Sequence, residues 1–579
     1  MKKLIYFVII TAFGLSSCSK DFLDRTPEAS VSPDASFKTK KDLELYTNSF
    51  YNYLPSAEGI YNEGVDNIVK TTLEDNISGK RIVPTTGGGW SWGELRNINF
   101  FLENCFNNLS EAEAAPYAGV ARFFRAYFYF EKLKRFGDVP WYGKTLSESD
   151  EEGLMKKRDP RTLIVDSILA DLDYAIEKIK ADKKSDIRIT QWTALALKSR
   201  VALFEGTFRK YHTELDLQGA DKLLEAAADA SKKLIDQKQY DIYVGAGIDS
   251  YAALFRSVNS IDQEVILTRK FSDALQIWHN VNYYTITASY GKPGLEKSLV
   301  NSYLMKDGSR FTDKPNYDKL TFLEEMKDRD PRLSQTIRYP GYKRIGGVAQ
   351  LAPNFGNSVT GYQLTKFVGD PMYDNYNRSE NDMPVIRYAE VLLNYAEARA
   401  ELGLLTQADL DLSINKIRAR IQMPGLNKDA ANSNPDKILA TDYPLVSGNN
   451  KGVILEIRRE RRIELVMETY RWDDILRWKA GQLVTRQFKG MYFPSIGKFD
   501  LDGDGKEDVW IYEGTKPTAS GIQLLKLGSE ILLENGTSGN VIVNPHIKKV
   551  FDETKDYFYP LPTQELELNE NLEQNPFWK

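Results

Sequence analysis

The stretch of sequence that decides the fold runs from Ile454 to Gly481 and reads ILEIRRERRIELVMETYRWDDILRWKAG. Its apolar residues recur every three or four positions, which is the period of an amphipathic helix. Between residues 458 and 464 arginine and glutamate are mixed, so opposite charges three or four positions apart can pair along the helix, and the glutamates argue against a phosphate site. Trp472 and Trp478 are expected to pack against neighbouring helices. We therefore interpret this segment as scaffold.

Similar helical segments lie upstream. The helix that ends at Gly137 is followed by Pro140, a clear stop signal, and Asp159 with Pro160 forms a natural helix start. The same periodicity predicts helices over residues 121–136, 159–180, 191–206, 220–235, 384–403 and 408–421. Paired helices with alanine and aromatic faces suggest tetratricopeptide-like hairpins, although no strict period of about 34 residues is present. The sequence therefore predicts a mainly α protein.

Long segments rich in Gly, Pro, Asn and Tyr separate these helices. They cover residues 54–92, 270–310, 338–384 and 485–550. Loops of this length inside a compact protein usually carry function. We therefore expect an irregular, loop-rich part that binds ligand.

Composition excludes several classes of function. The 579 residues carry a net charge of −5, so we expect no nucleic-acid partner. Three histidines and two cysteines are too few for a zinc site of the Cys or Cys/His type, or for a disulfide framework. Cys105, in an apolar segment, is expected to be buried and inert.

The N-terminus has the pattern of an export signal. Two lysines precede an apolar run of about a dozen residues, too short to cross a bilayer as a helix. The run ends in Leu-Ser-Ser before Cys18, which resembles the lipobox of bacterial lipoproteins. We predict a signal peptide over residues 1–17, lipidation of Cys18, a flexible stalk over residues 18–33 and one domain over residues 34–579. The alternative is an ordinary signal peptide with a chance cysteine.

Taken in order, several segments resemble the SusD/RagB family of outer-membrane lipoproteins of Bacteroidetes. They are CSKDFLDRTPE, RFFRAYFYFEKLKRFGDVPW, RITQWTALALKSRVALFEG, DMPVIRYAEVLLNYAEARAELG, INKIRARIQMPGL, RRERRIELVMETYRWDDILRW and YFYPLPTQELELNENLEQNPFW. The resemblance implies a SusD-like fold, an α-helical scaffold of tetratricopeptide-like hairpins with a loop-rich part. It further implies that the protein binds nutrient oligomers, chiefly glycans, at the cell surface. Its implied partner is a SusC-like TonB-dependent transporter, on which it would act as a lid.

The ligand-binding residues are expected in the loops, because Trp and Tyr offer a broad apolar face and a polar edge to a sugar. In residues 54–92 we expect Gly87 to Gly89 to expose two indoles. The candidates in that loop are Trp90, Trp92, Asp75 and Arg81. In the later loops they are Trp278, Tyr283, Tyr284, Tyr373 and Tyr376, with Tyr290, Asn375 and Arg378 nearby. The alternative is that these aromatic residues belong to small satellite cores.

One segment has the pattern of a calcium loop. Residues 500–508 read DLDGDGKED, and alternating aspartates around a glycine turn direct several hard oxygens at one point, as Ca²⁺ requires. The predicted ligands are Asp500, Asp502, Asp504, the Lys506 carbonyl and Asp508. Position twelve is Ile511, so the closing glutamate of an EF-hand is missing, and the pattern is closer to loops between strands, with a strand expected over residues 509–512. The alternative is a solvated turn without an ion.

Three functions remain open from the sequence. The first is a lipid-anchored receptor that passes an oligosaccharide to a transporter. The second is a glycan-degrading enzyme, which would need two carboxylates placed across a sugar; no nucleophile elbow, metal triad or phosphate loop is present. The third is a RagB-like scaffold that binds peptides or other proteins. We expect the first and predict no enzymatic activity.

Overall fold

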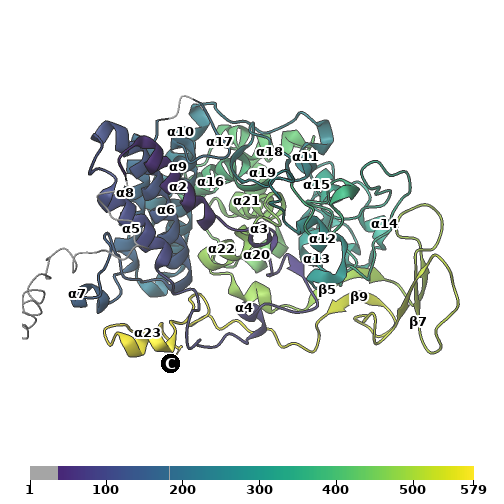
Figure 1. The fold of residues 1–579 in the computed structure, drawn as a ribbon. Coiled ribbons are helices and arrows are strands. Elements are labelled where there is room, and N and C mark those ends of the chain that lie inside the picture. Colours follow the sequence, from purple (N-terminus) through teal and green to yellow (C-terminus); the bar gives the residue numbers. More distant parts are fainter. Residues whose placement is uncertain (1–36, 181–182, 579) are drawn as a thin grey trace, which may run out of the picture.

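The computed structural model describes residues 37–180 and 183–578 (Figure 1). The predicted signal peptide, Cys18 and the whole predicted stalk lie outside the described residues. The longer helices gather at one side of the molecule, and long loops with short helices and small sheets occupy the other. With 44% of its residues in helices, the chain is mainly α, as predicted. None of the helices within 37–180 and 183–578 combines the length and the apolar character needed to span a bilayer.

The longer helices form the paired layer. They are α2 (Lys40–Ser49), α5 (Gly93–Asn104), α6 (Glu111–Phe136), α8 (Arg161–Lys178), α9 (Gln191–Tyr211), α10 (Ala220–Asp236), α16 (Tyr388–Glu401) and α21 (Lys451–Glu464). Helix α6 packs on α8, α8 on α9, α9 on α10, and α10 on α16. Thr190 caps α9 through its side chain, as a threonine before a helical run predicts. The predicted helical pairs are therefore present.

Helix α9 is longer than predicted. We expected it to stop at Gly206, but it continues to Tyr211. A Cβ on Gly206 would lie 2.9 Å from Leu224 Cγ of α10. The glycine therefore allows the two helices to approach closely, and does not end the first.

Three predicted helices are divided in the structure. Residues 383–387 form strand β4 (Met383–Arg387), which pairs antiparallel with β2 (Val265–Arg269) before α16 begins. The segment 408–421 is split into α17 (Gln407–Leu412) and α18 (Ile414–Arg420). The opening segment ends as a helix at Glu464 and resumes as α22 (Tyr470–Arg477). Met467 and Thr469 between them have φ of 64° and 71°, which a continuous α-helix does not allow.

The long loops contain short elements. The short helices, inside these loops or between the longer helices, are α3 (Ala57–Tyr61), α4 (Asp75–Ser78), α7 (Glu151–Leu154), α11 (Ser250–Arg256), α12 (Val281–Ile286), α13 (Lys297–Ser302), α14 (Phe322–Glu325), α15 (Pro331–Thr336), α19 (Lys428–Ser433), α20 (Lys437–Asp442) and α23 (Thr563–Leu568). The strands are β1 (Ile68–Val69), β3 (Gly294–Leu295), β5 (Phe488–Phe493), β6 (Gly497–Phe499), β7 (Val509–Tyr512), β8 (Gln523–Lys526) and β9 (Gly539–Val543). They pair as β1–β3, β5–β9 and β6–β7–β8. Strand β7 confirms the strand predicted at residues 509–512.

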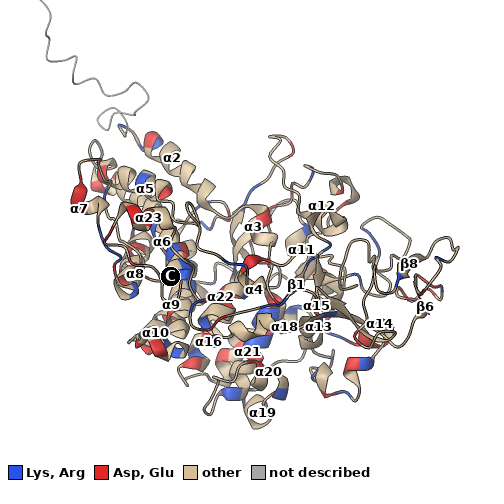
Figure 2. Cartoon of the chain, turned by 90° about the horizontal axis from the view of Figure 1, so that it is seen from below, with Lys and Arg blue, Asp and Glu red and all other residues tan. Residues whose placement is uncertain are grey.

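The mixed-charge segment forms a buried ion network between elements. The glutamates and arginines of α21, coloured red and blue in Figure 2, are buried. Glu464 contacts Arg387 at 2.9 Å, Arg420 at 2.6 Å and Arg332 at 3.0 Å. Burial alone would raise the pKa of Glu464, but the three guanidinium groups hold it well below its usual range. Most partners of this segment therefore come from other elements and not from the same helix. Trp478 is buried beside it, as expected.

Candidate functional site

Four tyrosines from two separate loops meet on one surface. Tyr283 and Tyr284 lie on α12, Tyr290 lies in the 3₁₀ turn Ala288–Tyr290, and Tyr376 follows the 3₁₀ turn Pro371–Tyr373. The rings of Tyr284 and Tyr290 are stacked with centroids 4.8 Å apart, and Tyr283 packs edge-on against Tyr376 at 5.7 Å. We call these four residues the tyrosine patch. The structure thus joins two of the aromatic clusters that the sequence indicated separately.

The tyrosine patch combines exposed rings with neutral hydroxyl groups. Tyr376 is 57% exposed, and Tyr283, Tyr284 and Tyr290 are half-buried. Burial, with the nearby charges of Glu74 and Glu58, raises the pKa of Tyr290 to about 12. The Tyr290 phenol is therefore protonated at neutral pH and can both donate and accept hydrogen bonds.

A lysine connects the tyrosine patch with a neighbouring hollow. The ammonium of Lys70 lies 4.7 Å from the ring centroid of Tyr290, and it donates to Asn62 Oδ1 at 3.1 Å and to Glu74 Oε1 at 2.9 Å. Asn62 and Glu74 also line a hollow of about 520 Å³. Patch and hollow are therefore adjacent, and together they offer aromatic, cationic and anionic groups to one ligand.

The hollow contains the two polar residues predicted in the loop 54–92. Asp75 is exposed at the start of α4. Arg81 is held in place, because its Nη1 donates to the carbonyls of Asp556 and Phe558 at 3.1 and 3.2 Å, and its guanidinium stacks on Tyr559. Asp75 is available to a ligand, whereas Arg81 mainly ties the loop to the C-terminal segment.

Trp278 and Tyr373 lie beside the tyrosine patch with different roles. Trp278 is half-buried, its Nε1 donates to Asp273 Oδ1 at 2.8 Å, and Arg378 lies 6.0 Å from its ring centroid. Tyr373 is only 6% exposed, and its hydroxyl donates to Glu380 Oε1 at 3.3 Å. The ring of Trp278 is therefore partly accessible to a ligand, whereas Tyr373 is buried and stabilises the loop through its hydrogen bond to Glu380.

The expectation that the glycines expose Trp90 is wrong. Trp90 is 5% exposed and packs edge-on against Phe136 with centroids 4.9 Å apart. The glycine carbonyls before it are fastened to α6, since Arg135 Nε donates to Gly88 O at 2.8 Å and the Lys132 ammonium donates to the next carbonyl. The loop is therefore folded back onto the helix.

Trp92 lies with Trp90 in a different place from the tyrosine patch. Its ring is half-buried, meets Trp90 at 84° and packs against Tyr142. Both indoles line a cavity of about 800 Å³ between α5, α7 and α23, whose walls include Leu95 and Leu572. The structure therefore separates this tryptophan pair from the other predicted ligand residues.

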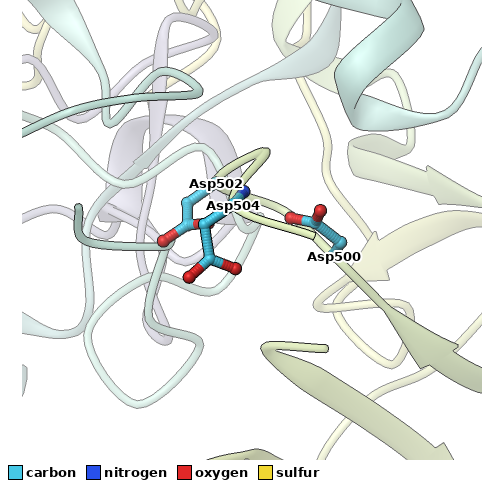
Figure 3. Close-up of side chains that lie close together, drawn as sticks. All are labelled: Asp500, Asp502 and Asp504. Carbon is cyan, nitrogen blue, oxygen red and sulfur yellow. The ribbon is translucent and has the colours of Figure 1, made fainter. Parts of the chain in front are cut away.

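The aspartate-rich segment forms a tight turn between β6 and β7. Asp500, Asp502 and Asp504 each place a carboxylate oxygen within 4.8 Å of the others (Figure 3). Asp502 is 5% exposed, and no ion pair of the described residues involves it. The Lys506 ammonium turns toward Asp504 at 2.9 Å, which leaves most of the negative charge uncompensated. Several hard oxygens around one point fit the requirements of Ca²⁺.

Asp508 closes the turn from the strand side. Its Oδ2 accepts from the amides of Leu501 and Asp502 at 2.7 and 3.1 Å. Burial raises the pKa of Asp508, and the charges of Asp502 and Asp500 add to that rise. This crowding of carboxylates would be relieved by a bound cation.

Comparison with known families identifies the relationship. A family model described as SusD family matches residues 263–578, more than half of the chain. The chain belongs to the SusD family. A second model, described as starch-binding associating with outer membrane, matches residues 90–203. The resemblance inferred from the sequence is confirmed.

Relatives and solved structures cover nearly the whole chain of this SusD-family protein. It is 24% identical to SusD-like protein P38 of Formosa agariphila, over 84% of this chain and 93% of that protein. It is 23% identical to a SusD-like protein of Bacteroides ovatus, over 87% and 90%. The crystal structure of a SusD-like carbohydrate-binding protein of Bacteroides fragilis matches with a TM-score of 0.68 at 23% identity, covering 93% of this chain and 99% of that one. A laminarin-binding SusD-like protein matches with a TM-score of 0.54 at 18% identity, over 93% and 100%.

Sequence reasoning missed some residues of the site. Lys70, Asn62 and Glu74 lie in the loop 54–92, and single polar residues of this kind carry no recognisable pattern. A usable signal was the tyrosine density of the loops, which named Tyr283, Tyr284 and Tyr376 but could not show that they meet.

Proposed function

We propose that this SusD-family protein captures oligosaccharides at the bacterial surface and delivers them to a SusC-like TonB-dependent transporter. The observation that carries the proposal is the tyrosine patch, with Lys70 and a hollow beside it. Carbohydrate binding by a SusD-like protein of Bacteroides fragilis and laminarin binding by another family member support it. The family description that associates the second matched region with the outer membrane supports the location.

The tyrosine patch suits sugar recognition chemically. Apolar C–H faces of a sugar ring can lie on the exposed ring of Tyr376 and on the half-buried rings beside it. The tyrosine hydroxyl groups, Asn62 and Asp75 then provide donors and acceptors for sugar hydroxyls. The proposed role includes no catalytic step.

Anchoring and delivery belong to the same proposal. Lipidation of Cys18, which lies outside the described residues, would hold the protein on the outer membrane facing outward. A lid must release its ligand, so we expect an affinity in the micromolar range or weaker, about −8 kcal/mol. Co-purification of a TonB-dependent transporter with the tagged, lipidated chain tests the partner, and a chain with Cys18→Ala should lose both membrane retention and that partner.

Binding is tested with variants of the tyrosine patch. Tyr284→Ala and Tyr376→Ala are expected to weaken binding to a glycan panel by about 1–3 kcal/mol each. Phe577→Ala, which removes another exposed ring (68% exposed), is the matched control and should bind like the wild type. Retention in glycan-containing native gels and calorimetry measure the effect. Wild-type affinity in both tyrosine variants would refute the site.

Two further arms separate the alternatives. Release of shortened sugars from the same panel by purified protein would indicate an enzyme. Binding of a peptide library at the tyrosine patch, with no glycan bound, would favour a RagB-like peptide receptor. Binding of glycan without product release is the outcome that the proposed receptor requires.

We also propose that the turn over residues 500–508 binds Ca²⁺ as a structural ion. Asp500, Asp502, Asp504, Asp508 and the Lys506 carbonyl are its predicted ligands. The amide of Gly341 donates to the Asp502 carbonyl at 2.9 Å, so the turn is also attached to the loop 338–384. EDTA is expected to lower Tm and to accelerate proteolysis in this turn, and Ca²⁺ should reverse both. An Asp500→Asn chain should no longer respond to either reagent, and a wild-type chain without a response would refute the ion.

A further inference from the structure

A second hollow lies beside the hollow next to the tyrosine patch. Its volume is about 260 Å³, and its walls come mainly from α6 and α22. The walls include four half-buried aromatic side chains, which are Tyr53, Tyr127, Trp472 and Tyr559. We call this cavity the second hollow. It combines aromatic and polar groups, as binding sites for small molecules and sugars do.

The two hollows meet at a common wall. Arg135, Trp472 and Tyr559 line both of them. The guanidinium groups of Arg135 and Arg81 lie 3.8 and 4.2 Å from the ring centroid of Tyr559. Two cations therefore occupy the ring of Tyr559, whereas no cation of the described residues lies over the ring of Trp472. Trp472 is thus the aromatic side chain at this border that a ligand can reach.

Two hydrogen-bond donors along this path have no protein acceptor. Within residues 37–180 and 183–578, neither the indole nitrogen of Trp472 nor the hydroxyl of Tyr127 makes a hydrogen bond, and neither atom is sealed from solvent. Desolvation raises the pKa of Tyr127, so its hydroxyl stays protonated. Both groups can therefore donate to a ligand that lies in the hollows.

The charges of the second hollow are balanced by the protein itself. Its walls contain three acids and three bases, namely Glu94, Glu131, Asp473, Lys132, Lys134 and Arg135. The Lys134 ammonium lies 2.8 Å from Glu131 Oε1 and 2.8 Å from Asp473 Oδ2. The Lys132 ammonium and Arg135 Nε donate to glycine carbonyls. The cations thus have acceptors, and the carboxylates keep further lone pairs for sugar hydroxyls, which suits a neutral ligand.

The second hollow continues the path that begins at the tyrosine patch. Lys70 connects Tyr290 of the patch with the hollow. The hollow extends to Trp472, and from Trp472 the second hollow extends to Tyr127 on α6. Only an extended chain can contact both ends of this path.

We propose that the second hollow is an additional subsite for a neutral oligosaccharide that is longer than the tyrosine patch and the hollow can hold. The inference rests on the proposed glycan-binding function and adds the charge and the length class of the ligand. One sugar lies with its apolar face on the Trp472 indole, whose N–H donates to a hydroxyl. Tyr127 and Asp473 form hydrogen bonds with hydroxyls of the next unit.

The test measures how affinity depends on ligand length. Malto-, cello- and laminari-oligosaccharides, from the disaccharide to the heptasaccharide, are titrated by calorimetry into the wild type and its variants. In a series that binds, wild-type affinity is expected to rise with length until the second hollow is filled. For the longest member, Tyr127→Phe should lose roughly fivefold in affinity and Trp472→Ala roughly tenfold. Both should bind the shortest member that the wild type binds with unchanged affinity.

Matched controls separate loss of the subsite from loss of the fold. Tyr117→Phe removes a hydroxyl from α6 outside both hollows, and Trp510→Ala removes a half-buried indole from β7. Both should keep the wild-type dependence on length. Equal Tm values of wild type and Tyr127→Phe exclude misfolding. Should Trp472→Ala lower Tm, the comparison of Tyr127→Phe with Tyr117→Phe decides.

The outcomes separate this inference from the receptor proposal. A long-to-short affinity ratio that is the same in wild type, Tyr127→Phe and Trp472→Ala overturns the second subsite, even if Tyr284→Ala still weakens binding at every length. Tighter binding of oligogalacturonate than of every neutral series overturns the neutral class. If no series binds, crystals soaked in glucose are the probe. A glucose ring at Trp472, within hydrogen-bond distance of Tyr127 or Asp473, then supports the subsite, and an empty second hollow overturns it.

Discussion

Glu63 makes the stability of the ligand-side loop depend on pH. It lies between Asn62 of the hollow and the start of β1, and is 3% exposed. Its Oε2 accepts from Asn67 Nδ2 at 3.1 Å and from the Met467 amide at 3.0 Å, but its Oε1 is buried without a partner. Burial raises the pKa of Glu63 from 4.5 to about 7, against the lowering effect of those two hydrogen bonds.

The sign of the effect follows from the raised pKa. The folded chain holds the proton of Glu63 more tightly than the unfolded chain. The contribution of this proton to the free energy of unfolding is complete below pH about 4.5, and it is lost as the pH rises through about 7. This difference between the pKa values of the folded and unfolded chain corresponds to at most roughly 3 kcal/mol in the free energy of unfolding. For the 540 described residues, an unfolding entropy of ~2.1 cal/mol/K per residue converts that energy into a Tm change of roughly 3 °C.

Glu63→Gln reproduces the protonated side chain at every pH. Scanning calorimetry of both chains should show nearly equal Tm values at pH 4.5, and at pH 8 a Tm roughly 3 °C higher for Glu63→Gln than for the wild type. Glu225→Gln, an exposed acid on α10, is the control and should show no such divergence. A gap between Glu63→Gln and wild type that is the same at both pH values would refute the reasoning.

Other substitutions test the two indoles and one close contact. Trp90→Ala is expected to lower stability by roughly 3 kcal/mol or more, because it empties a buried site, and to leave glycan affinity unchanged; calorimetry of unfolding and of binding separates the two. Trp278→Ala should do the reverse and weaken glycan binding by about 1–3 kcal/mol, and an unchanged affinity would remove it from the site. Gly452→Ala should abolish soluble expression, since its Cβ would lie 1.9 Å from the Ala431 carbonyl oxygen, whereas Gly93→Ala, with open space around it, should express normally.

Local patterns predicted the elements that depend on local interactions. Helices α6, α8, α9, α10, α16 and α21 of the paired layer and the strand Val509–Tyr512 were predicted from periodicity and capping residues, whereas α2 and α5 were not. The helix predicted over residues 384–403 was wrong at its start, because Met383–Arg387 pairs as a strand with Val265–Arg269, far away in the sequence. Apolar residues in so short a run fit a strand or a helix equally well, and only the distant partner decides.

The candidate site could be predicted by residue type but not by assembly. Loop tyrosines were expected to bind ligand, yet the approach of Tyr283 to Tyr376 depends on how two loops fold against each other. Trp90 was placed at the surface because glycines preceded it. Contacts of Arg135 and Lys132 with the glycine carbonyls reverse that expectation, and no spacing in the sequence records them.

The segment Ile454–Gly481 contributes Trp472 to the wall of the hollow, and its buried charges position two of the ligand loops. Arg471 contacts Asp66 of the loop 54–92 at 2.6 Å. Glu468 contacts Lys366 of the loop 338–384 at 2.7 Å. Both pairs are buried, and a buried charge that loses its partner costs about 3–5 kcal/mol. Each loop is therefore held in one position, because moving it would separate a buried ion pair at a high cost in free energy.

A third loop, 270–310, is attached to α21 of the same segment by a neutral acceptor, since Arg459 donates to the Ser302 carbonyl at 3.2 Å. The tyrosine patch needs residues from the loops 270–310 and 338–384, and its hollow needs the loop 54–92. Because all three loops are fastened to one rigid pair of helices, their relative positions are set before a sugar arrives, which reduces the ordering entropy lost on binding. The charged residues between 458 and 471 thus affect ligand affinity indirectly, because their contacts fix the positions of the loops that bind the ligand.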